Sequence, residues 1–274
     1  MKKLENNVFN LLVMRGVLVK YPKISIVTVC FNSERTIRQT IESVLNQTYT
    51  NIEYILIDGK STDGTIDIIL EYAPLFSKKN ISYSWVSEAD NGIYDAINKG
   101  VRAATGEWVG IINSDDWYEL DACEVIYRAS LSSSELKVIY GICALYANAV
   151  DHQKYVMAMI YQRTFECMAT SFETMAHPPV FVKKCVYNDF CFDLKYKLAA
   201  DVDFLFQVFL KYGRYTKFIP NVIANFRDGG ASYTQFYLSM KENYQIRFKY
   251  GVISRNKLRI KLLIMFIKHK ILRK

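Results

Sequence analysis

The chain has 274 residues, 51% of them hydrophobic, and a formal net charge of +8 at pH 7. A chain of this length and hydrophobic content can bury a full core, which excludes a disordered protein. Eight of its 35 basic residues and none of its 27 acidic residues follow residue 252, so residues 1–252 contain 27 of each sign. Because the whole excess charge lies in the C-terminal tail, we expect no nucleic-acid partner.

The six cysteines form no CxxC pair and no regular spacing. Their positions within apolar runs predict reduced, buried thiols in a cytosolic protein. The first 22 residues include a short apolar patch, 8–13, without a small-residue cleavage signature, so they do not resemble a signal peptide. We interpret 1–22 as an N-terminal extension that is either an accessory helix or partly a start-site artefact.

Residues 23–116 alternate β-rich apolar runs with segments of helical periodicity. The runs predict strands at 23–30, 52–57, 81–86 and 108–112. Helices are expected in between, the last over 93–104. This alternation predicts an α/β fold with a mostly parallel sheet that is covered by helices on both faces. Neither a glycine-rich dinucleotide fingerprint nor a GxxxxGK[ST] loop occurs, which disfavours a Rossmann oxidoreductase and a P-loop NTPase.

The pattern is less regular after residue 131. It predicts a strand near 138–140, a helix that ends at Gly213, a strand over 218–225 and a long helix over 234–250. There is no internal repeat and no low-complexity linker. We therefore expect one catalytic domain, 23–232, built from halves 23–116 and 117–232. Residues 233–274 would form a C-terminal helical appendage.

Polar side chains follow three of the predicted strands, where ligands gather in open α/β sheets. The most informative are Asp115 and Asp116, which directly follow the fourth strand. Adjacent carboxylates raise each other's pKa unless a cation or hydrogen bonds compensate, and a divalent metal is the simplest compensator. Alternatively, Asp116 caps a helix that begins near Tyr118. On these residues alone, both interpretations remain open.

Four motifs occur in a fixed order along the chain, at residues 27–33 (VTVCFNS), 57–65 (IDGKSTDGT), 90–100 (DNGIYDAINKG) and 113–116 (NSDD). Together they resemble the motifs of family 2 of the inverting glycosyltransferases, which have the GT-A fold. The resemblance covers residues 23 to 232. It implies a GT-A-like, mostly parallel sheet flanked by helices.

The resemblance also implies a role for each matching residue. The expected contacts with the nucleotide-sugar donor are Thr28, Asn32, Asp58, Asp90, Asn98 and Asp115. Asp58 would accept a hydrogen bond from the base and Asp115 would face the ribose. Asp116 would ligate the Mn²⁺ or Mg²⁺ that bridges the diphosphate, and Asp201 would serve as the general base.

The chain departs from the family pattern at Gly59, Lys60 and Ala200. Lys60 fills a position that is often held by glycine in the family. Gly59 stands where many members carry a second aspartate, which leaves the contact to the base open. Ala200 stands where many carry a glutamate, which leaves the base open between Asp201 and Asp203. His177 either contacts the acceptor or the metal, or is a hydrogen-bonded, partly buried histidine.

The expected function follows from the resemblance: transfer of a sugar, with inversion, from a nucleotide-sugar, most simply a UDP-sugar, to a glycan or lipid-linked acceptor in bacterial surface-polysaccharide assembly. A non-catalytic nucleotide-sugar-binding scaffold subunit is the alternative. A nucleotidyltransferase is disfavoured because no glycine- and arginine-rich loop follows the first strand.

The C-terminal tail places basic residues on both sides of an apolar centre, 262–267, that is too short to span a bilayer. Such a segment suits the surface of an anionic membrane. We therefore expect a cytoplasmic protein that is peripheral on the inner face of the cell membrane. The alternative is a helix that packs on the domain and leaves its charges in water.

Overall fold

The structure, a computed structural model, describes residues 11–14, 17–146, 156–157 and 176–272. Nine strands of this part form one mixed sheet. In sheet order they are β5 (Ser82–Ser87), β4 (Ile52–Asp58), β3 (Ile24–Cys30), β6 (Trp108–Ile111), β10 (Val180–Lys183), β8 (Val138–Tyr146), β11 (Thr216–Arg227) and β7 (Trp117–Tyr118), with β9 (Val156–Met157) beside β8. The first four are mutually parallel, which confirms the α/β fold expected from the alternation of residues 23–116.

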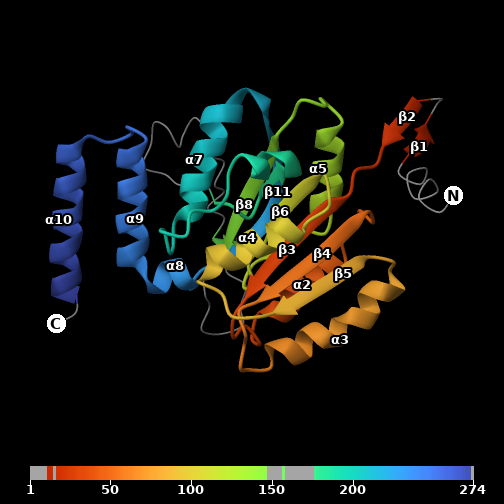
Figure 1. Ribbon diagram of the computed structural model, residues 1–274, viewed down its shortest axis with the longest axis horizontal. Helices are drawn as coiled ribbons and strands as arrows, with labels where there is room; N and C mark the ends of the chain where they lie inside the picture. The colour runs from red at the N-terminus through yellow and green to blue at the C-terminus, as the bar shows by residue number, and fades with distance from the viewer. Residues whose placement is uncertain (1–10, 15–16, 147–155, 158–175, 273–274) are drawn as a thin grey trace.

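The sheet is covered on both faces (Figure 1). One face packs on α4 (Ile93–Ala103) and α7 (Ala200–Tyr212), and the other packs on α2 (Ile37–Leu45), α3 (Thr65–Lys78) and α5 (Ala122–Ser130). Strand β3 shows why its sequence does not alternate between apolar and polar residues. Its alternate residues Ile24 and Ile26 enter one core, Val27 and Val29 enter the other, and all seven of its residues are buried.

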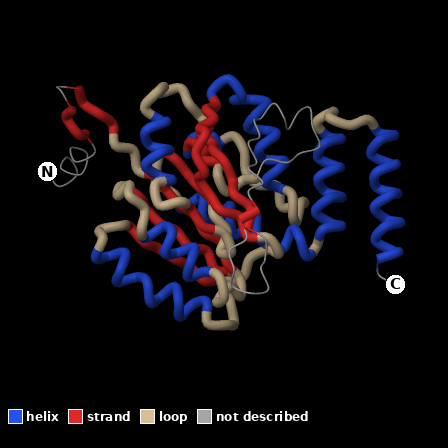
Figure 2. Tube along the Cα trace, turned by 180° about the vertical axis from the view of Figure 1, so that it is seen from behind, coloured by secondary structure: helices blue, strands red, loops and turns tan. Residues whose placement is uncertain are grey.

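Helices α9 (Phe236–Lys249) and α10 (Arg255–Leu272) follow the short α8 (Ala231–Thr234). They stand side by side at one end of the molecule, opposite the N-terminal hairpin (Figures 1 and 2). Short 3₁₀ turns cover Lys184–Asn188 and Gly213–Tyr215, and α7 ends at Tyr212, as expected from Gly213.

The N-terminal hairpin consists of β1 (Leu11–Met14) and β2 (Val17–Lys20), which pair antiparallel. The accessory-helix interpretation is therefore wrong for these eight residues, while residues 1–10 and 15–16 lie outside the described part. Two short apolar runs separated by two residues that include Gly16 are typical of a hairpin, a signal that the helix interpretation overlooked.

Two further expectations need correction. Asp116 caps no helix, because it precedes strand β7 and α5 begins only after Asp121. Of the five cysteines in the described residues, all are free, but Cys185 and Cys191 are exposed rather than buried. Cys185 lies in a 3₁₀ turn and Cys191 in an irregular segment, where neighbouring apolar residues do not imply a core position.

Helix α4 lies unusually close to β3 at Gly100. A Cβ atom at this position would stand 2.3 Å from Cγ1 of Val27 and 3.2 Å from Cγ1 of Ile57. Both valine and isoleucine are buried, so neither side chain can turn into solvent. The glycine therefore sets the distance between the helix that carries the third motif and the strand that carries the first.

We predict that Gly100→Ala lowers the free energy of unfolding by about 1–2 kcal/mol, because overpacking outweighs the gain in helix propensity. Urea unfolding followed by circular dichroism measures this. Arg102→Ala, at an exposed position of the same helix, is the matched control and should stay within about 0.5 kcal/mol. In a Val27→Ala background the penalty should largely disappear, and an equal penalty there would contradict the close-packing argument.

Candidate active site

The carboxyl ends of β3, β4 and β6 meet at one edge of the sheet. Cys30 lies opposite Asp58 in the β3–β4 ladder, and the Gly59 N–H donates to the carbonyl of Cys30 at 2.8 Å. The loop after β3 also reaches the loop after β6, since the hydroxyls of Ser33 and Ser114 are 2.8 Å apart. Three motifs that are far apart in the sequence are therefore brought together.

Asn32 fixes the loops that follow β3 and β4. Its backbone has φ 49°, a left-handed conformation that asparagine tolerates better than most residues. Its Oδ1 accepts a hydrogen bond from the Thr62 N–H at 2.8 Å, and its own N–H donates to Oγ of Ser61 at 2.8 Å. The side chain of Asn32 thus shapes the rim of the site.

Asp58 and Thr28 lie at this edge, but their side chains are fully buried. The Asp58 carboxylate accepts hydrogen bonds from the N–H of Ser61 at 2.9 Å and from the hydroxyl of Ser87 at 2.6 Å. Oγ1 of Thr28 accepts from the Tyr54 hydroxyl at 3.0 Å. In this conformation Thr28 links β3 to β4. The Asp58 carboxylate is used by Ser61 and Ser87 and does not face a free surface where a base could bind.

Asp90 lies where Gly59 leaves room. Its Oδ1 accepts from the N–H of Gly92 at 2.8 Å, while its Oδ2 would be 2.7 Å from a Cβ at Gly59. The carboxylate of Asp90 thus occupies the space next to the strand end where the sequence lacks a second aspartate. Phe31, which is 62% exposed, flanks the same glycine, and sequence analysis did not single it out.

Asn98 does not face this edge. Its amide donates to the carbonyl of Phe192 at 2.8 Å and accepts from the N–H of the same residue at 3.0 Å, and it is buried. Since both ends of the amide are used, the expectation of a donor contact is replaced by a structural role. Asn98 ties α4 to the segment before α7.

The acidic pair after β6 is the most strongly perturbed group of the site. Asp116 is fully buried; burial and the charge of Asp115 raise its pKa well above the usual value, against the opposing effect of Arg227. One oxygen, Oδ1, accepts from the Arg227 N–H at 2.9 Å, but the buried Oδ2 has no hydrogen-bond partner among the described residues. Burial likewise raises the pKa of Asp115.

Arg227, at the end of β11, is a neighbour of the pair that sequence reasoning missed. Its Nε donates to the carbonyl of Asp115 at 3.1 Å, and its guanidinium lies 5.3 Å from the centre of the Trp117 ring. Arg227 is more than a hundred residues from the pair in the sequence, and the three-dimensional arrangement reveals the contact. A Cβ at Gly230 would be 2.8 Å from Oδ2 of Asp115, so this loop also closes over the pair.

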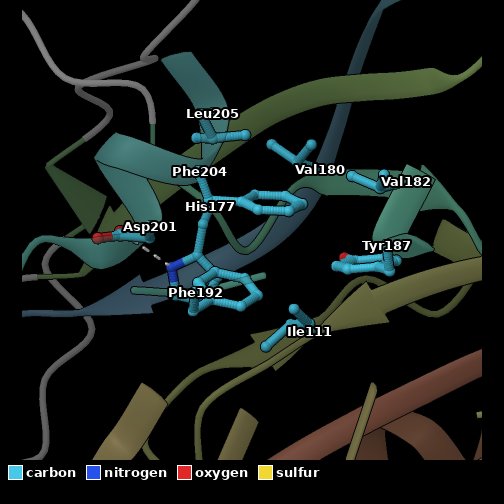
Figure 3. Close-up of a pocket in the computed structure, with 9 residues that line it drawn as sticks. All are labelled: Ile111, His177, Val180, Val182, Tyr187, Phe192, Asp201, Phe204 and Leu205. Atoms are coloured by element: carbon cyan, nitrogen blue, oxygen red, sulfur yellow. Dashed lines mark ion pairs between the residues drawn. The ribbon is translucent and has the colours of Figure 1, made fainter. Parts of the chain in front are cut away.

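Asp201, in the first turn of α7, receives partners on both oxygens. The Tyr94 hydroxyl donates to Oδ1 at 2.8 Å, and Nδ1 of His177 lies 3.5 Å from Oδ2 (Figure 3). Burial raises the pKa of Asp201, but the hydrogen bonds and charge supplied by His177 and Tyr94 outweigh it, so the pKa lies below its usual value. The carboxylate is thus kept ionised beside a largely apolar cavity.

Asp203 points elsewhere, as expected for a residue two positions away on a helix. Its Oδ1 accepts from Nζ of Lys249 at 2.7 Å and from the Tyr250 hydroxyl at 3.1 Å, and its Oδ2 accepts from Gln207 at 3.0 Å. Only 1% of it is exposed. Of the two aspartates left open by the sequence, Asp201 is the one that lines the cavity.

The residues at the edge suit a magnesium or manganese ion that is shared with a substrate. Within the described residues, no group of three or more His, Cys, Asp or Glu is arranged to hold a metal. Mg²⁺, however, is commonly bound through one or two carboxylates together with substrate phosphates. The unpartnered Oδ2 of Asp116, beside a second carboxylate, fits that kind of site.

Comparison with known sequences gives several relatives. The chain is 35% identical over 117 residues to the putative glycosyltransferase EpsH of Bacillus subtilis, which covers 43% of this chain and 33% of that protein. It is 26% identical over 222 residues to the PGL/p-HBAD biosynthesis glycosyltransferase Rv2957 of Mycobacterium tuberculosis, covering 78% and 80%. The putative teichuronic acid biosynthesis glycosyltransferase TuaG of B. subtilis is 34% identical over 103 residues, covering 38% and 40%. The chain thus spans a third of one relative and most of another.

Solved structures support the fold. TarS 1–349 of S. aureus in complex with UDP-GlcNAc aligns with a TM-score of 0.59 at 19% identity, covering 82% of this chain and 66% of that one. The mannosyltransferase PcManGT of Pyrobaculum calidifontis, in complex with GDP-Man and Mn²⁺, gives 0.62 at 16% identity, covering 85% and 65%. The GT-A-like architecture expected from the motifs is therefore confirmed.

The sequence profile described as "Glycosyl transferase family 2" matches residues 25–175, which is more than half of the chain. This range contains β3 to β6 and the acidic pair, the elements that form the edge described above. Sequence profile and fold agree, and the chain belongs to glycosyl transferase family 2.

Proposed function

We propose that the protein is an inverting, metal-dependent glycosyltransferase that moves a sugar from a nucleoside-diphosphate sugar to a glycan or lipid-linked acceptor. The observation that carries the proposal is the buried carboxylate of Asp116, whose Oδ2 has no partner in the described residues and whose neighbour is a second carboxylate. A cation shared with a diphosphate satisfies that oxygen and both charges.

The donor would lie along the edge formed by β3, β4 and β6. Asp90 beside Gly59, the exposed Phe31 and the rim built by Asn32 suit the base and ribose, with Asp115 near the ribose. Asp116 would hold the Mn²⁺ or Mg²⁺, which when bound neutralises charge on the departing diphosphate. Relatives named for surface glycans and the UDP-GlcNAc complex of TarS support a UDP-sugar donor and a surface-polysaccharide acceptor.

The acceptor would approach from the side of Asp201. An ionised carboxylate in this place can receive the hydroxyl proton while the oxygen attacks the anomeric carbon, a contribution of typically 10²–10⁴-fold. A single displacement needs no covalent nucleophile, and it inverts the anomeric configuration. The lowered pKa of Asp201, set by burial against its bonds to His177 and Tyr94, keeps it ready at neutral pH.

We predict that Asp116→Asn abolishes stabilisation of the protein by UDP plus Mn²⁺ in thermal unfolding, because the metal loses its carboxylate. Without ligand, the variant should be as stable as the wild type or more so. Its advantage should grow as the pH rises above about 4, since the raised pKa of Asp116 makes ionisation unfavourable in the folded state.

Glu135→Gln, which removes one exposed negative charge, is the matched control for Asp116→Asn. It should leave the response to UDP and Mn²⁺ unchanged. Undiminished stabilisation of Asp116→Asn by the same ligands would contradict the metal assignment.

For Asp201→Asn we predict that binding of the UDP-sugar is retained while kcat falls by about 10²–10⁴-fold, because an amide cannot accept the proton. Asp203→Asn is the comparison. It weakens the contacts with Lys249 and Tyr250, so its stability should fall while its rate per folded molecule is kept. If Asp203→Asn lost kcat while Asp201→Asn kept it, Asp203 would be the base. If the wild-type protein bound UDP-sugars but transferred none, it would be a scaffold subunit.

Contact with a membrane surface is a separate part of the proposal. No helix in the described range is long and apolar enough to cross a membrane. Helix α10 exposes Ile260 and Leu263 by 57% and 59%, with Lys257 and Arg259 also exposed. Apolar side chains among basic ones suit shallow insertion into an anionic surface.

We predict that the protein sediments with vesicles containing phosphatidylglycerol and not with pure phosphatidylcholine, and that salt weakens the binding. Replacing Ile260, Leu263 and Ile264 together by Ser should lower the affinity on the order of tenfold or more, since their insertion is lost. Leu210→Ser, at a 66% exposed site on α7, is the control. Equal binding of the triple variant would exclude α10 as the contact.

A further inference from the structure

Both oxygens of the Asp201 carboxylate lie next to side chains of the protein, and 20% of this side chain is exposed. Tyr94 occupies Oδ1 at 2.8 Å, and the imidazole of His177 stands in front of Oδ2 with its Nδ1 at 3.5 Å. Tyr94 is buried at the start of α4, so it fixes which oxygen of Asp201 remains for the histidine. Asp201 and His177 line the same cavity, so both lie where a substrate in that cavity would contact them.

The other ring nitrogen of His177 is not used by the described residues. Because Nδ1 faces Asp201, Nε2 points away from the carboxylate, and in the described part of the chain this buried nitrogen has no hydrogen-bond partner. Buried polar atoms are nearly always paired in native structures, so an unpaired ring nitrogen indicates a partner that arrives from outside. A hydroxyl of the acceptor is such a partner.

The backbone at His177 is restricted, and its side chain borders the strand that leads to the acidic pair. The carbonyl of His177 accepts from the N–H of Val180 at 3.0 Å, and two prolines separate these residues, which restricts the backbone. Ile111, the last residue of β6, lines the same cavity as His177 and Asp201.

We propose that His177 and Asp201 act together as the base, with His177 receiving the acceptor proton at Nε2 and Asp201 orienting the ring through Nδ1. This rests on the proposed function and changes which group touches the acceptor. As the acceptor oxygen bonds to the anomeric carbon, its proton passes to Nε2 and the bond between that carbon and the diphosphate oxygen breaks. The imidazolium that results is stabilised by the carboxylate of Asp201, and Tyr94 is a positioning residue.

The surroundings favour this pair. Val180, Phe192, Phe204 and Leu205 line the cavity beside it (Figure 3). An apolar lining keeps the local dielectric low, which strengthens the attraction between the carboxylate and an imidazolium. It also shields the proton-accepting nitrogen from bulk water on that side.

The test uses the full-length protein with Mn²⁺ and a panel of UDP-, GDP- and dTDP-sugars, with water as the acceptor and release of the nucleoside diphosphate as the signal. On the donor that the wild type hydrolyses fastest, we expect His177→Gln to lower kcat by about 100-fold or more, with KM for the donor within about threefold. His177→Ala should regain activity when imidazole is added, because free imidazole can enter the space left by the ring. Asp201→Asn, measured in the same buffer, should not be rescued.

The outcomes separate this proposal from the one it rests on. If His177→Gln keeps kcat within about threefold of the wild type while Asp201→Asn is inactive, the aspartate is the direct base and the inference is wrong, although the glycosyltransferase proposal stands. Failure of imidazole to restore any activity to folded His177→Ala would also overturn it, and this readout remains decisive if the glutamine variant does not fold. A wild type that hydrolyses no sugar donor would refute the proposed function itself.

Discussion

A fully buried carboxylate next to a half-buried one is the constraint around which this molecule is organised. Asp116 is fully buried at the end of β6 beside Asp115, and burial together with that neighbour raises its pKa well above the ordinary value. The N–H and the positive charge of Arg227 compensate only part of this unfavourable burial of the Asp116 carboxylate. An unpartnered carboxylate oxygen beside a second carboxylate favours binding of a cation.

The sheet explains how distant segments meet at this place. Parallel strands β3, β4 and β6 end at one edge, so their loops lie together on one side of the site, while α4 connects this side to Asp201. The same helix holds Asn98 against Phe192 and Tyr94 against Asp201. Because Gly100 lets the backbone of α4 pack directly against Val27 of β3, the distance between α4 and the strand ends is set by backbone packing rather than by flexible side chains.

The sequence allowed the helices and strands of 23–116 to be predicted, because each is long, periodic and bounded by turn residues. It also identified the acidic pair, since charges directly after an apolar strand are rare. It could not separate residues that face a ligand from those that build the site. Asp58 and Asn98 belong to motifs, but their hydrogen-bond partners Ser87 and Phe192 lie far along the chain. Likewise, nothing local distinguishes Asp201 from Asp203, and Arg227 has no motif.

The contacts of Asp203 have a consequence for how the C-terminal helices should be regarded. This residue, two positions after Asp201, is anchored to Lys249 at the end of α9, and Glu242 of the same helix accepts from the N–H groups of Lys197 and Leu198 just ahead of α7. The first turn of α7 is thus held in place by contacts with α9. A truncated protein that ended before α9 would lose these contacts, so α9 supports the helix that carries Asp201 and belongs structurally with the sheet domain.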